Sequence, residues 1–188
     1  FSALLKLPAD GNGAVFARMN EDKNYRGYDF WLQNRSFGTH IVSEWPNNAL
    51  KVVSDKQLEV NKWQHVVITY DGSSKASGIK LYIDGNLVGN KVEQDSLNDS
   101  ILTEAPFKIG SRSKTSHFKG ELDELRIYDR ALGVDEIKSI GGDPIKSLLV
   151  IDKKERSKEQ KMTLLNYYLN NNDDEYKRLV AIKNDLNK

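Results

Sequence analysis

One acidic residue in the segment HFKGELDELRIYDRAL, residues 117–132, occupies a position where an apolar residue is expected. Side chains alternate across a β-strand with a period of two, so Asp123 would share a face with Leu125 and Ile127. A carboxylate on a core-facing position loses several kcal/mol unless it finds a partner. The pattern therefore predicts that Asp123 meets backbone N–H groups, a cation, or solvent at the end of the strand.

Aromatic and polar side chains are concentrated in the segment NYRGYDFW, residues 24–31, and at Trp45. Flat aromatic rings offer apolar faces on which sugar rings can stack, and neighbouring polar groups can bind the hydroxyls. Most of these aromatic residues are expected in the core. Alternation places Phe30 on one face of its strand and Trp31 on the other, so Trp31 is the one of the two that is expected to be exposed. The candidate ligand-binding side chains are Tyr25, Trp31 and Trp45.

Composition excludes several classes of function. The 188 residues carry 28 lysines and arginines against 27 aspartates and glutamates, so the chain lacks the strong positive field that nucleic-acid binding usually needs. The absence of cysteine excludes disulfides, thiolate catalysis, cysteine zinc sites and a CxxCH haem site. No apolar run approaches the roughly 20 residues that span a bilayer. We therefore expect neither nucleic-acid binding nor membrane insertion.

Short strands separated by turn residues fill the first three quarters of the sequence. The segment IKLYIDGNLV, residues 79–88, is the best hairpin signal, because its apolar residues alternate and Asp84-Gly85 supplies the positive φ of a tight turn. The other predicted strands are the opening stretch and residues 28–33, 39–43, 63–70 and 107–110. At least seven short strands, with no long helical periodicity before residue 134, predict an antiparallel β-sandwich.

The pattern changes after residue 141, where helical signals replace strand signals. Ser157 and Gln160 have the spacing of a capping box ahead of an apolar helical stripe that begins at Met162. Residues 1–141 are therefore predicted to form the sandwich, and residues 142–188 a helical appendage or linker. This appendage is too small to bury much surface by itself, so we expect it to pack on the sandwich, a partner or a neighbouring domain.

Four motifs in order resemble the bacterial laminin-G-like domain of the concanavalin A-like lectin/glucanase superfamily. They are NKWQHVVITYDG, IKLYIDGNLVG, FKIGS and FKGELDELRIYDRALGVDEI, and the resemblance covers roughly residues 1–140. It implies an all-β, jelly-roll sandwich of two antiparallel sheets, in agreement with the strand pattern. Two positions depart from the family: Leu5 stands near an expected tryptophan, and Gly133 stands where serine or threonine commonly caps the final short helix.

The tail segment ERSKEQKMTLLNYYLNNNDDEYKRL, residues 155–179, is similar to the segment that follows this domain in large exported bacterial proteins with a planctomycete-type cytochrome c domain. The resemblance implies an interior module of a longer envelope protein, periplasmic or at the cell surface, with any haem elsewhere. The opening segment FSALLKL, which starts inside an expected strand, also suggests an excised piece of a longer chain.

The resemblance also bears on metal binding. Related sandwiches often use an acid in the last strand, with loop carbonyls, to hold a structural Ca²⁺, and a hard cation suits oxygen ligands. It therefore implies Asp123 as a candidate Ca²⁺ ligand, the alternative being a carboxylate that bonds nearby amides or lies at the rim. The loop of residues 111–116, SRSKTS, is cationic where pentraxins carry carboxylates, so pentraxin-style Ca²⁺-dependent recognition is not expected.

Catalysis has weaker support than binding. Glycoside hydrolysis needs two carboxylates across the scissile bond, and Glu121, Asp123 and Glu124 match this only superficially because the ExDxxE order of the related glucanases is absent. Asp71 and Asp84 precede glycines and are best explained as turn residues. The three histidines, which lack the spacing of metal ligands, are His40, His65 and His117.

The sequence therefore favours a non-catalytic recognition module of a larger exported protein, not an enzyme. Its expected partners are a carbohydrate or another envelope protein, bound through the loops of the sandwich, and the neighbouring domains of the parent chain. The alternative is a purely structural interdomain scaffold with no ligand of its own.

Overall fold

The computed structural model describes residues 1–141, 144–149 and 151–186, and the chain divides into two compact units, residues 1–141 and 142–188. The strands of the first unit are β1 (Ser2–Lys6), β2 (Gly13–Asn20), β3 (Arg26–Gln33), β4 (Ser36–Glu44), β5 (Asn48–Gln57), β6 (Gln64–Tyr70), β7 (Ile79–Ile83), β8 (Asn86–Val88), β9 (Asn90–Asp95), β10 (Lys108–Ile109) and β11 (Glu121–Arg126). One short 3₁₀ turn, Ala76–Gly78, precedes β7.

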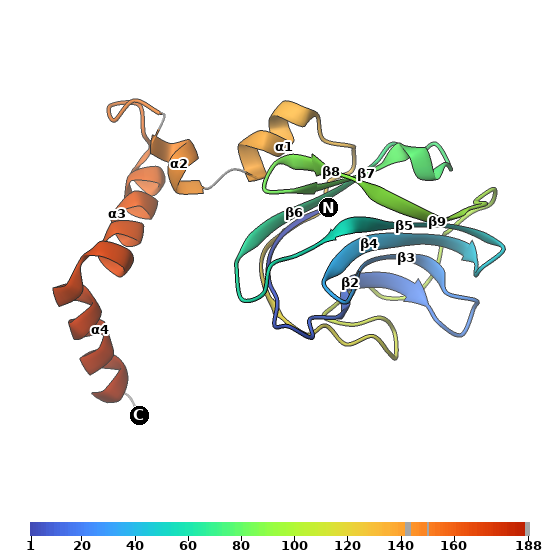
Figure 1. Cartoon of the computed structure of the whole chain (residues 1–188), viewed down its shortest axis with the longest axis horizontal. Coiled ribbons are helices and arrows are strands. Elements are labelled where there is room, and N and C mark those ends of the chain that lie inside the picture. The colour runs from blue at the N-terminus through green and yellow to red at the C-terminus, as the bar shows by residue number, and fades with distance from the viewer. Residues whose placement is uncertain (142–143, 150, 187–188) are drawn as a thin grey trace. The chain divides into compact units, whose positions relative to one another are not determined.

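The strands form two antiparallel sheets that stack face to face (Figure 1). The five-stranded sheet has the order β11-β1-β6-β7-β8, and the six-stranded sheet has the order β10-β2-β3-β4-β5-β9. This arrangement confirms the predicted jelly-roll sandwich. The Asp84-Gly85 turn also lies where the sequence predicts it, with φ of 49° and 78°.

The main core lies between the sheets and fixes the register of the strands. Phe16 of β2 pairs with Phe30 of β3, and their rings meet edge to face at 5.8 Å between centroids. Ile68 and Leu81, which are paired in the opposite sheet, are also buried. Each such side chain contributes roughly 1.5–3 kcal/mol when fully buried. Because a slip of one residue would expose this whole set, the core holds alternate β3 residues on the outer face of the six-stranded sheet.

The hairpin of β3 and β4 sets which residues face each other on that outer face. Asn34 and Arg35 form its two-residue turn with φ of 49° and 63°, the left-handed backbone that tight hairpins need. The pairing then runs without a shift from Gln33 opposite Ser36 to Gly27 opposite Val42. The predicted strands of residues 28–33 and 39–43 left Gly38 in the bend between them, but Gly38 lies inside β4.

The outer face of the five-stranded sheet is covered by helix α1 (Val134–Gly141; Figure 1). Ile137 of this helix is buried against Val67 and Tyr82, which are paired neighbours in β6 and β7. At the start of the helix the Glu136 carboxylate accepts the Gly133 N–H at 2.9 Å. This bond is one half of a capping box, and Gly133 has no hydroxyl to form the other half with the Glu136 N–H.

Strand β11 differs from its prediction because its alternation is interrupted. Leu122 and Leu125 both pack against the core, and the two residues between them, Asp123 and Glu124, are exposed. Glu124 has φ of 51°, and the pairing with β1 shifts by one residue at this point, which is a β-bulge. Ile127 lies beyond the strand and is 47% exposed. The prediction that Asp123 and Ile127 face the core was therefore wrong.

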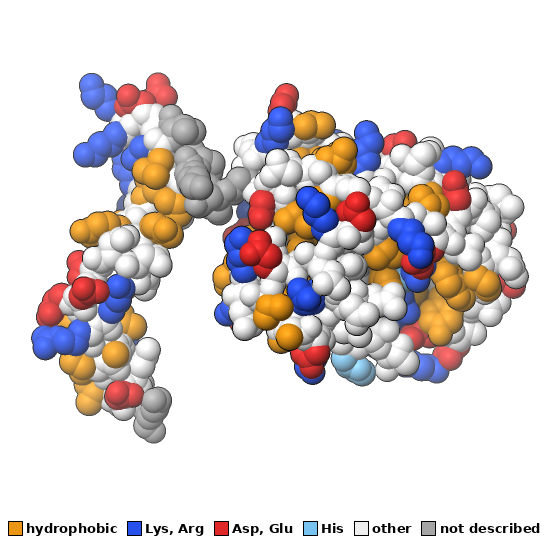
Figure 2. Space-filling view, viewed as in Figure 1, with side chains coloured by type: hydrophobic (Ala, Val, Ile, Leu, Met, Phe, Trp, Pro, Cys, Tyr) orange, Lys and Arg blue, Asp and Glu red, His pale blue; other side chains and the backbone are white. Residues whose placement is uncertain are grey.

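The second unit consists of helices α2 (Pro144–Leu149), α3 (Lys158–Asn172) and α4 (Asp174–Leu186). Ser157 and Gln160 form the predicted capping box, with the Gln160 N–H donated to Ser157 Oγ at 3.1 Å and the Ser157 N–H donated to Gln160 Oε1 at 2.8 Å. Figure 2 shows apolar side chains between charged ones along this unit, and Met162 and Leu179 are 49% and 53% exposed. Within the described residues, no helix is long and apolar enough to cross a membrane.

Candidate functional site

A pocket of about 350 Å³ lies on the outer face of the six-stranded sheet. We call it the aromatic pocket, and its lining residues are Met19, Tyr25, Trp31, His40, Val42, Trp45, Lys51 and Arg112. It brings together Tyr25, Trp31 and Trp45, the three ligand-binding candidates of the sequence prediction. Five lining residues lie in strands β2 to β5 and three lie in loops, whereas the sequence analysis expected binding through the loops of the sandwich.

The floor of the aromatic pocket is a small apolar cluster separate from the main core. Its buried members are Ala17 and Met19 of β2, Val42 of β4 and Ala49 of β5, and Trp45 packs against them. Well-packed side chains of this kind leave little freedom to the groups above them. The cluster therefore fixes the position of Trp45 although that residue lies just beyond the end of β4.

Trp31 extends across the sheet because its neighbour in β4 has no side chain. Trp31 pairs with Gly38, and Lys51 of β5 reaches its ring with Nζ at 4.9 Å from the centroid. The same Nζ is 5.9 Å from the centroid of the Trp45 ring. A Cβ on Gly38 would lie 2.1 Å from the carbonyl oxygen of Val52, so no larger residue fits there. A lysine cation over two indoles is favourable and joins the two sides of the pocket.

His40 separates the two indoles at the base of the aromatic pocket. Its ring meets Trp31 edge to face at 5.0 Å between centroids, and it meets Trp45 in the same way at 5.4 Å. The imidazole is held by Asp29, whose Oδ1 is 3.0 Å from His40 Nδ1 and accepts the His40 backbone N–H at 2.9 Å. The orientation of both indoles therefore depends on one buried carboxylate.

Asp29 is fully buried beneath the pocket and is paired with two basic residues. Besides His40, Arg112 donates to Asp29 Oδ2 from Nε at 2.8 Å and lies within 2.7 Å through Nη2. Burial alone would raise the pKa of Asp29, but the charges and hydrogen bonds of His40 and Arg112 outweigh it and hold the pKa below its ordinary value. The carboxylate thus stays ionised, as expected for a buried charge with good partners.

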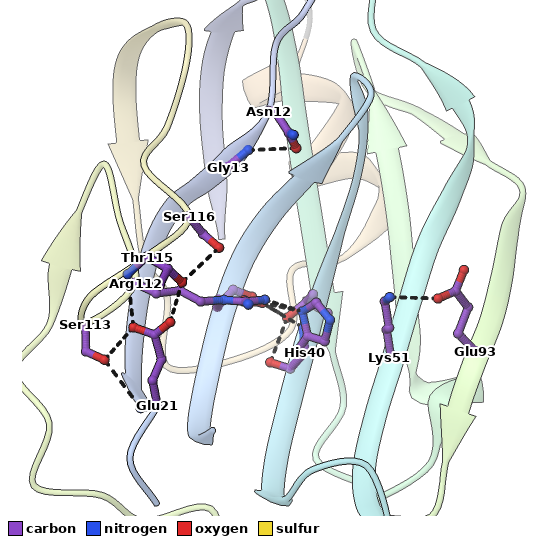
Figure 3. Close-up of polar contacts among 12 residues, drawn as sticks. Asn12, Gly13, Glu21, His40, Lys51, Glu93, Arg112, Ser113, Thr115 and Ser116 are labelled. Atoms are coloured by element: carbon purple, nitrogen blue, oxygen red, sulfur yellow. Dashed lines mark hydrogen bonds and ion pairs between the residues drawn. The ribbon is translucent and has the colours of Figure 1, made fainter. Parts of the chain in front are cut away.

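Arg112 reaches Asp29 from the cationic loop of residues 111–116, which a second carboxylate holds in place. Glu21 accepts hydrogen bonds from Ser113 Oγ at 2.7 Å and from the Thr115 N–H at 3.2 Å (Figure 3). It also accepts from Thr115 Oγ1 and from the Lys114 N–H. The guanidinium of Arg112 lies 5.7 Å from the centroid of the Tyr25 ring. The loop therefore forms one wall of the aromatic pocket.

Sequence reasoning missed the charged residues of this site. Asp29 carried a usable signal, because alternation puts it on the same face as Trp31. Arg112 carried no such signal, because it lies 83 residues from Asp29 in the sequence and local patterns do not show which distant segments meet. Lys51 is paired with Glu93 of β9 at 2.8 Å, and this contact also depends on which strands become neighbours.

Asp123 lies on the edge strand of the other sheet, away from the aromatic pocket. Its Oδ1 accepts the Glu124 N–H at 2.8 Å, which is the alternative that the sequence left open. No three acidic or histidine side chains in the described part of the chain come together as metal ligands. The calcium hypothesis for Asp123 stays a sequence prediction. The adjacent acids Glu121 and Glu124 pair with Lys6 and Arg126.

Comparisons with known proteins agree with this fold. Residues 1–138 match the family model of the concanavalin A-like lectin/glucanases superfamily. Botulinum neurotoxin type X of Clostridium botulinum is 22% identical over 126 residues, which are 67% of this chain and 9% of the toxin. The chain thus spans less than a tenth of the length of this curated relative.

Several solved structures are similar to the first unit, among them two with TM-scores above 0.5. One is the CBM40 of the Ruminococcus gnavus IT-sialidase bound to α2,3-sialyllactose, with a TM-score of 0.57, 14% identity, and coverage of 76% of this chain and 80% of that chain. The other is the binding domain of Paraclostridial Mosquitocidal Protein 1, with a TM-score of 0.54, 19% identity, and coverage of 74% and 35%. At this level of identity the likeness is one of fold.

Proposed function

Because the chain belongs to the concanavalin A-like lectin/glucanases superfamily, we propose that its first unit is a non-catalytic module that binds carbohydrate in the aromatic pocket. The observation that carries this proposal is the grouping of Tyr25, Trp31 and Trp45 around one pocket with polar groups between them. Tyr25 is 37% exposed and both indoles are half-buried, so a ligand can reach all three rings. Such rings stack on the apolar faces of sugars.

The charges of the pocket favour a neutral saccharide. Arg112 is paired with Asp29, and Lys51 is paired with Glu93, so each cation of the lining already has a carboxylate beside it. A ligand with a full negative charge would compete with these two ion pairs. Neutral hydroxyl groups can instead accept from the charged N–H donors without breaking the pairs.

The carboxylates near the pocket support binding over hydrolysis. A glycosidase acid needs a raised pKa so that it can carry the proton given to the leaving group. The ion pair and hydrogen bond with Lys51 lower the pKa of Glu93, and the pKa of Asp29 is also lowered, against the effect of its burial, by His40 and Arg112. Both groups are therefore suited to structural roles.

The wider setting of the module is also part of the proposal. The similarity of residues 155–179 to the tails of large exported proteins supports a place in a longer exported chain, periplasmic or at the cell surface. An envelope protein is the second type of ligand that we consider there. The alternative is an interdomain scaffold, which the exposed apolar side chains of α3 and α4 favour, since neighbouring domains could cover them.

A glycan array tests the proposal directly. The intact chain should retain a defined set of neutral glycans, and Trp45→Ala should lose them while its circular dichroism spectrum stays that of the parent. Trp63→Ala is the matched control, because Trp63 is 43% exposed and lies outside the aromatic pocket, before β6. A chain that retains no glycan, or a Trp45→Ala variant that retains the same set, would favour the scaffold.

A further inference from the structure

Trp31 lines a second pocket as well as the aromatic pocket. The second pocket, which we call the polar pocket, has a volume of about 240 Å³ and is lined by Asn12, Gly13, Trp31, Gln33, Ser116 and His117. Gln33 follows Trp31 by two residues in β3, so both side chains lie on the outer face of the sheet, about 7 Å apart along the strand. The two pockets are therefore neighbours on one face, with the Trp31 indole between them.

The chemistry of the polar pocket differs from that of its neighbour. Two amides, one hydroxyl and one imidazole line it, and the Trp31 indole is its one aromatic ring other than that imidazole. Asn12, Gln33 and His117 are exposed, so the Gln33 amide, the His117 imidazole and the Asn12 Nδ2 are open to a ligand. Groups of this kind form hydrogen bonds with sugar hydroxyls, whereas the aromatic pocket offers surfaces for stacking.

The walls of the polar pocket are held by the backbone. Gly13 has φ of 95°, and a Cβ at this position would lie 2.1 Å from the His117 carbonyl oxygen. The Ala14 N–H donates to the Ser116 carbonyl oxygen at 2.7 Å, and the Gly13 N–H donates to Asn12 Oδ1 at 3.0 Å (Figure 3). The loop that ends at His117 is thus fixed directly on β2. A pocket built in this way needs little ordering when a ligand binds.

We propose that the polar pocket is a second saccharide subsite, so that the module binds an oligosaccharide of at least two units along β3. This inference rests on the proposed function of the aromatic pocket. One unit stacks against Trp45 and one side of Trp31, and the next unit crosses Trp31 and bonds to Gln33, Asn12 and Ser116. The shared indole is what makes the two pockets one continuous site.

Affinity measured against ligand length tests this inference. The probes are neutral cello-, manno-, xylo- and malto-oligosaccharides of one to six units, titrated against the intact chain by calorimetry. We expect at least one series to bind about tenfold or more tightly at two or three units than at one. Gln33→Ala should lower the affinity for the longer ligands about tenfold, as the loss of one or two hydrogen bonds implies. It should leave the affinity for a single sugar unit unchanged.

Two variants separate the possible failures. Gln57→Ala is the matched control, because Gln57 is an exposed glutamine at the end of β5 that lines neither pocket. Trp45→Ala should weaken ligands of every length. A single unit that binds as tightly as the longer ligands, or a Gln33→Ala variant that matches Gln57→Ala, would overturn the second subsite while the proposed function stands. A parent chain that binds none of the probes would overturn both.

Discussion

Replacing Asp29 by asparagine should destabilise the first unit strongly, although the two side chains have nearly the same size. The side chain is fully buried and has four polar contacts, two with His40 and two with Arg112. Asparagine keeps the shape but removes the charge and turns an N–H donor toward the Arg112 guanidinium. The partly buried Arg112 cation is then left without its carboxylate.

The size of the effect follows from these contacts. Hydrogen bonds to a charged group contribute about 1.5–3 kcal/mol each, and removal of one partner of a buried ion pair costs about 3–5 kcal/mol. The Arg112 side chain is 13% exposed and can regain part of its solvation in the variant. We therefore expect Asp29→Asn to lower the free energy of unfolding by about 3 kcal/mol. For a unit of this size, that corresponds to a fall in Tm of about 10–15 °C.

The loss of stability caused by Asp29→Asn should depend on pH in a defined direction. The pKa of Asp29 in the folded chain lies below the value of about 3.9 in an unfolded chain. Folding then favours the ionised form, so its stabilising effect is complete above pH ~4 and is lost as the pH falls through the folded pKa. The difference between the parent and Asp29→Asn should therefore shrink in acid.

Urea unfolding followed by tryptophan fluorescence is a suitable assay, because Trp31, Trp45 and Trp63 all lie in the first unit. Arg112→Met and the double variant complete a thermodynamic cycle. We expect the double variant to lose clearly less stability than the sum of the single losses, since neither partner is then left alone. A loss below about 1 kcal/mol for Asp29→Asn, or additive effects, would refute the buried ion pair.

Three further substitutions or treatments test separate parts of the structure. Gly38→Ala should lower the unfolding free energy by about 3 kcal/mol or more, because the new Cβ would meet the Val52 carbonyl oxygen at 2.1 Å. Gly133→Ala is the control and should lower it by less than about 1 kcal/mol, because its Cβ would have no contact closer than 3.5 Å. Equal losses for the two variants would contradict this. Burial lowers the pKa of His65, so stability should be full above pH ~6.5 and fall as the pH drops through the folded pKa, and His65→Gln should flatten this part of the pH profile. Addition of Ca²⁺ and then a chelator should leave Tm unchanged, because Asp123 already accepts the Glu124 N–H and is exposed; a rise in Tm with Ca²⁺ would restore the calcium hypothesis.

Local patterns predicted the elements of the fold well because they depend on neighbouring residues. The alternation of β3 placed Trp31 outside and Phe30 inside, and the Asp84-Gly85 pair marked a turn that the structure contains. The capping box at Ser157 depends on two residues three positions apart, and it formed as predicted. Each of these features is decided within one strand, turn or helix.

Features that depend on pairing between distant segments were not predictable in the same way. The bulge at Glu124 shifts the alternation of β11 and turns Asp123 outward, and nothing in the local sequence marks it. The contact between Arg112 and Asp29 requires the loop of residues 111–116 to lie beside β3. Gly38 was assigned to a bend because glycine is common in turns, whereas here it allows β4 and β5 to approach each other closely.

The three indole N–H signals in a proton–nitrogen NMR spectrum give the most direct test of carbohydrate binding at the aromatic pocket. The chain contains three tryptophans, and two of them line that pocket. During titration with neutral oligosaccharides, the Trp31 and Trp45 signals should shift together and saturate while the Trp63 signal stays in place. Saturable binding that leaves Trp31 and Trp45 unmoved, or no response to any of the saccharides, would contradict the proposed site.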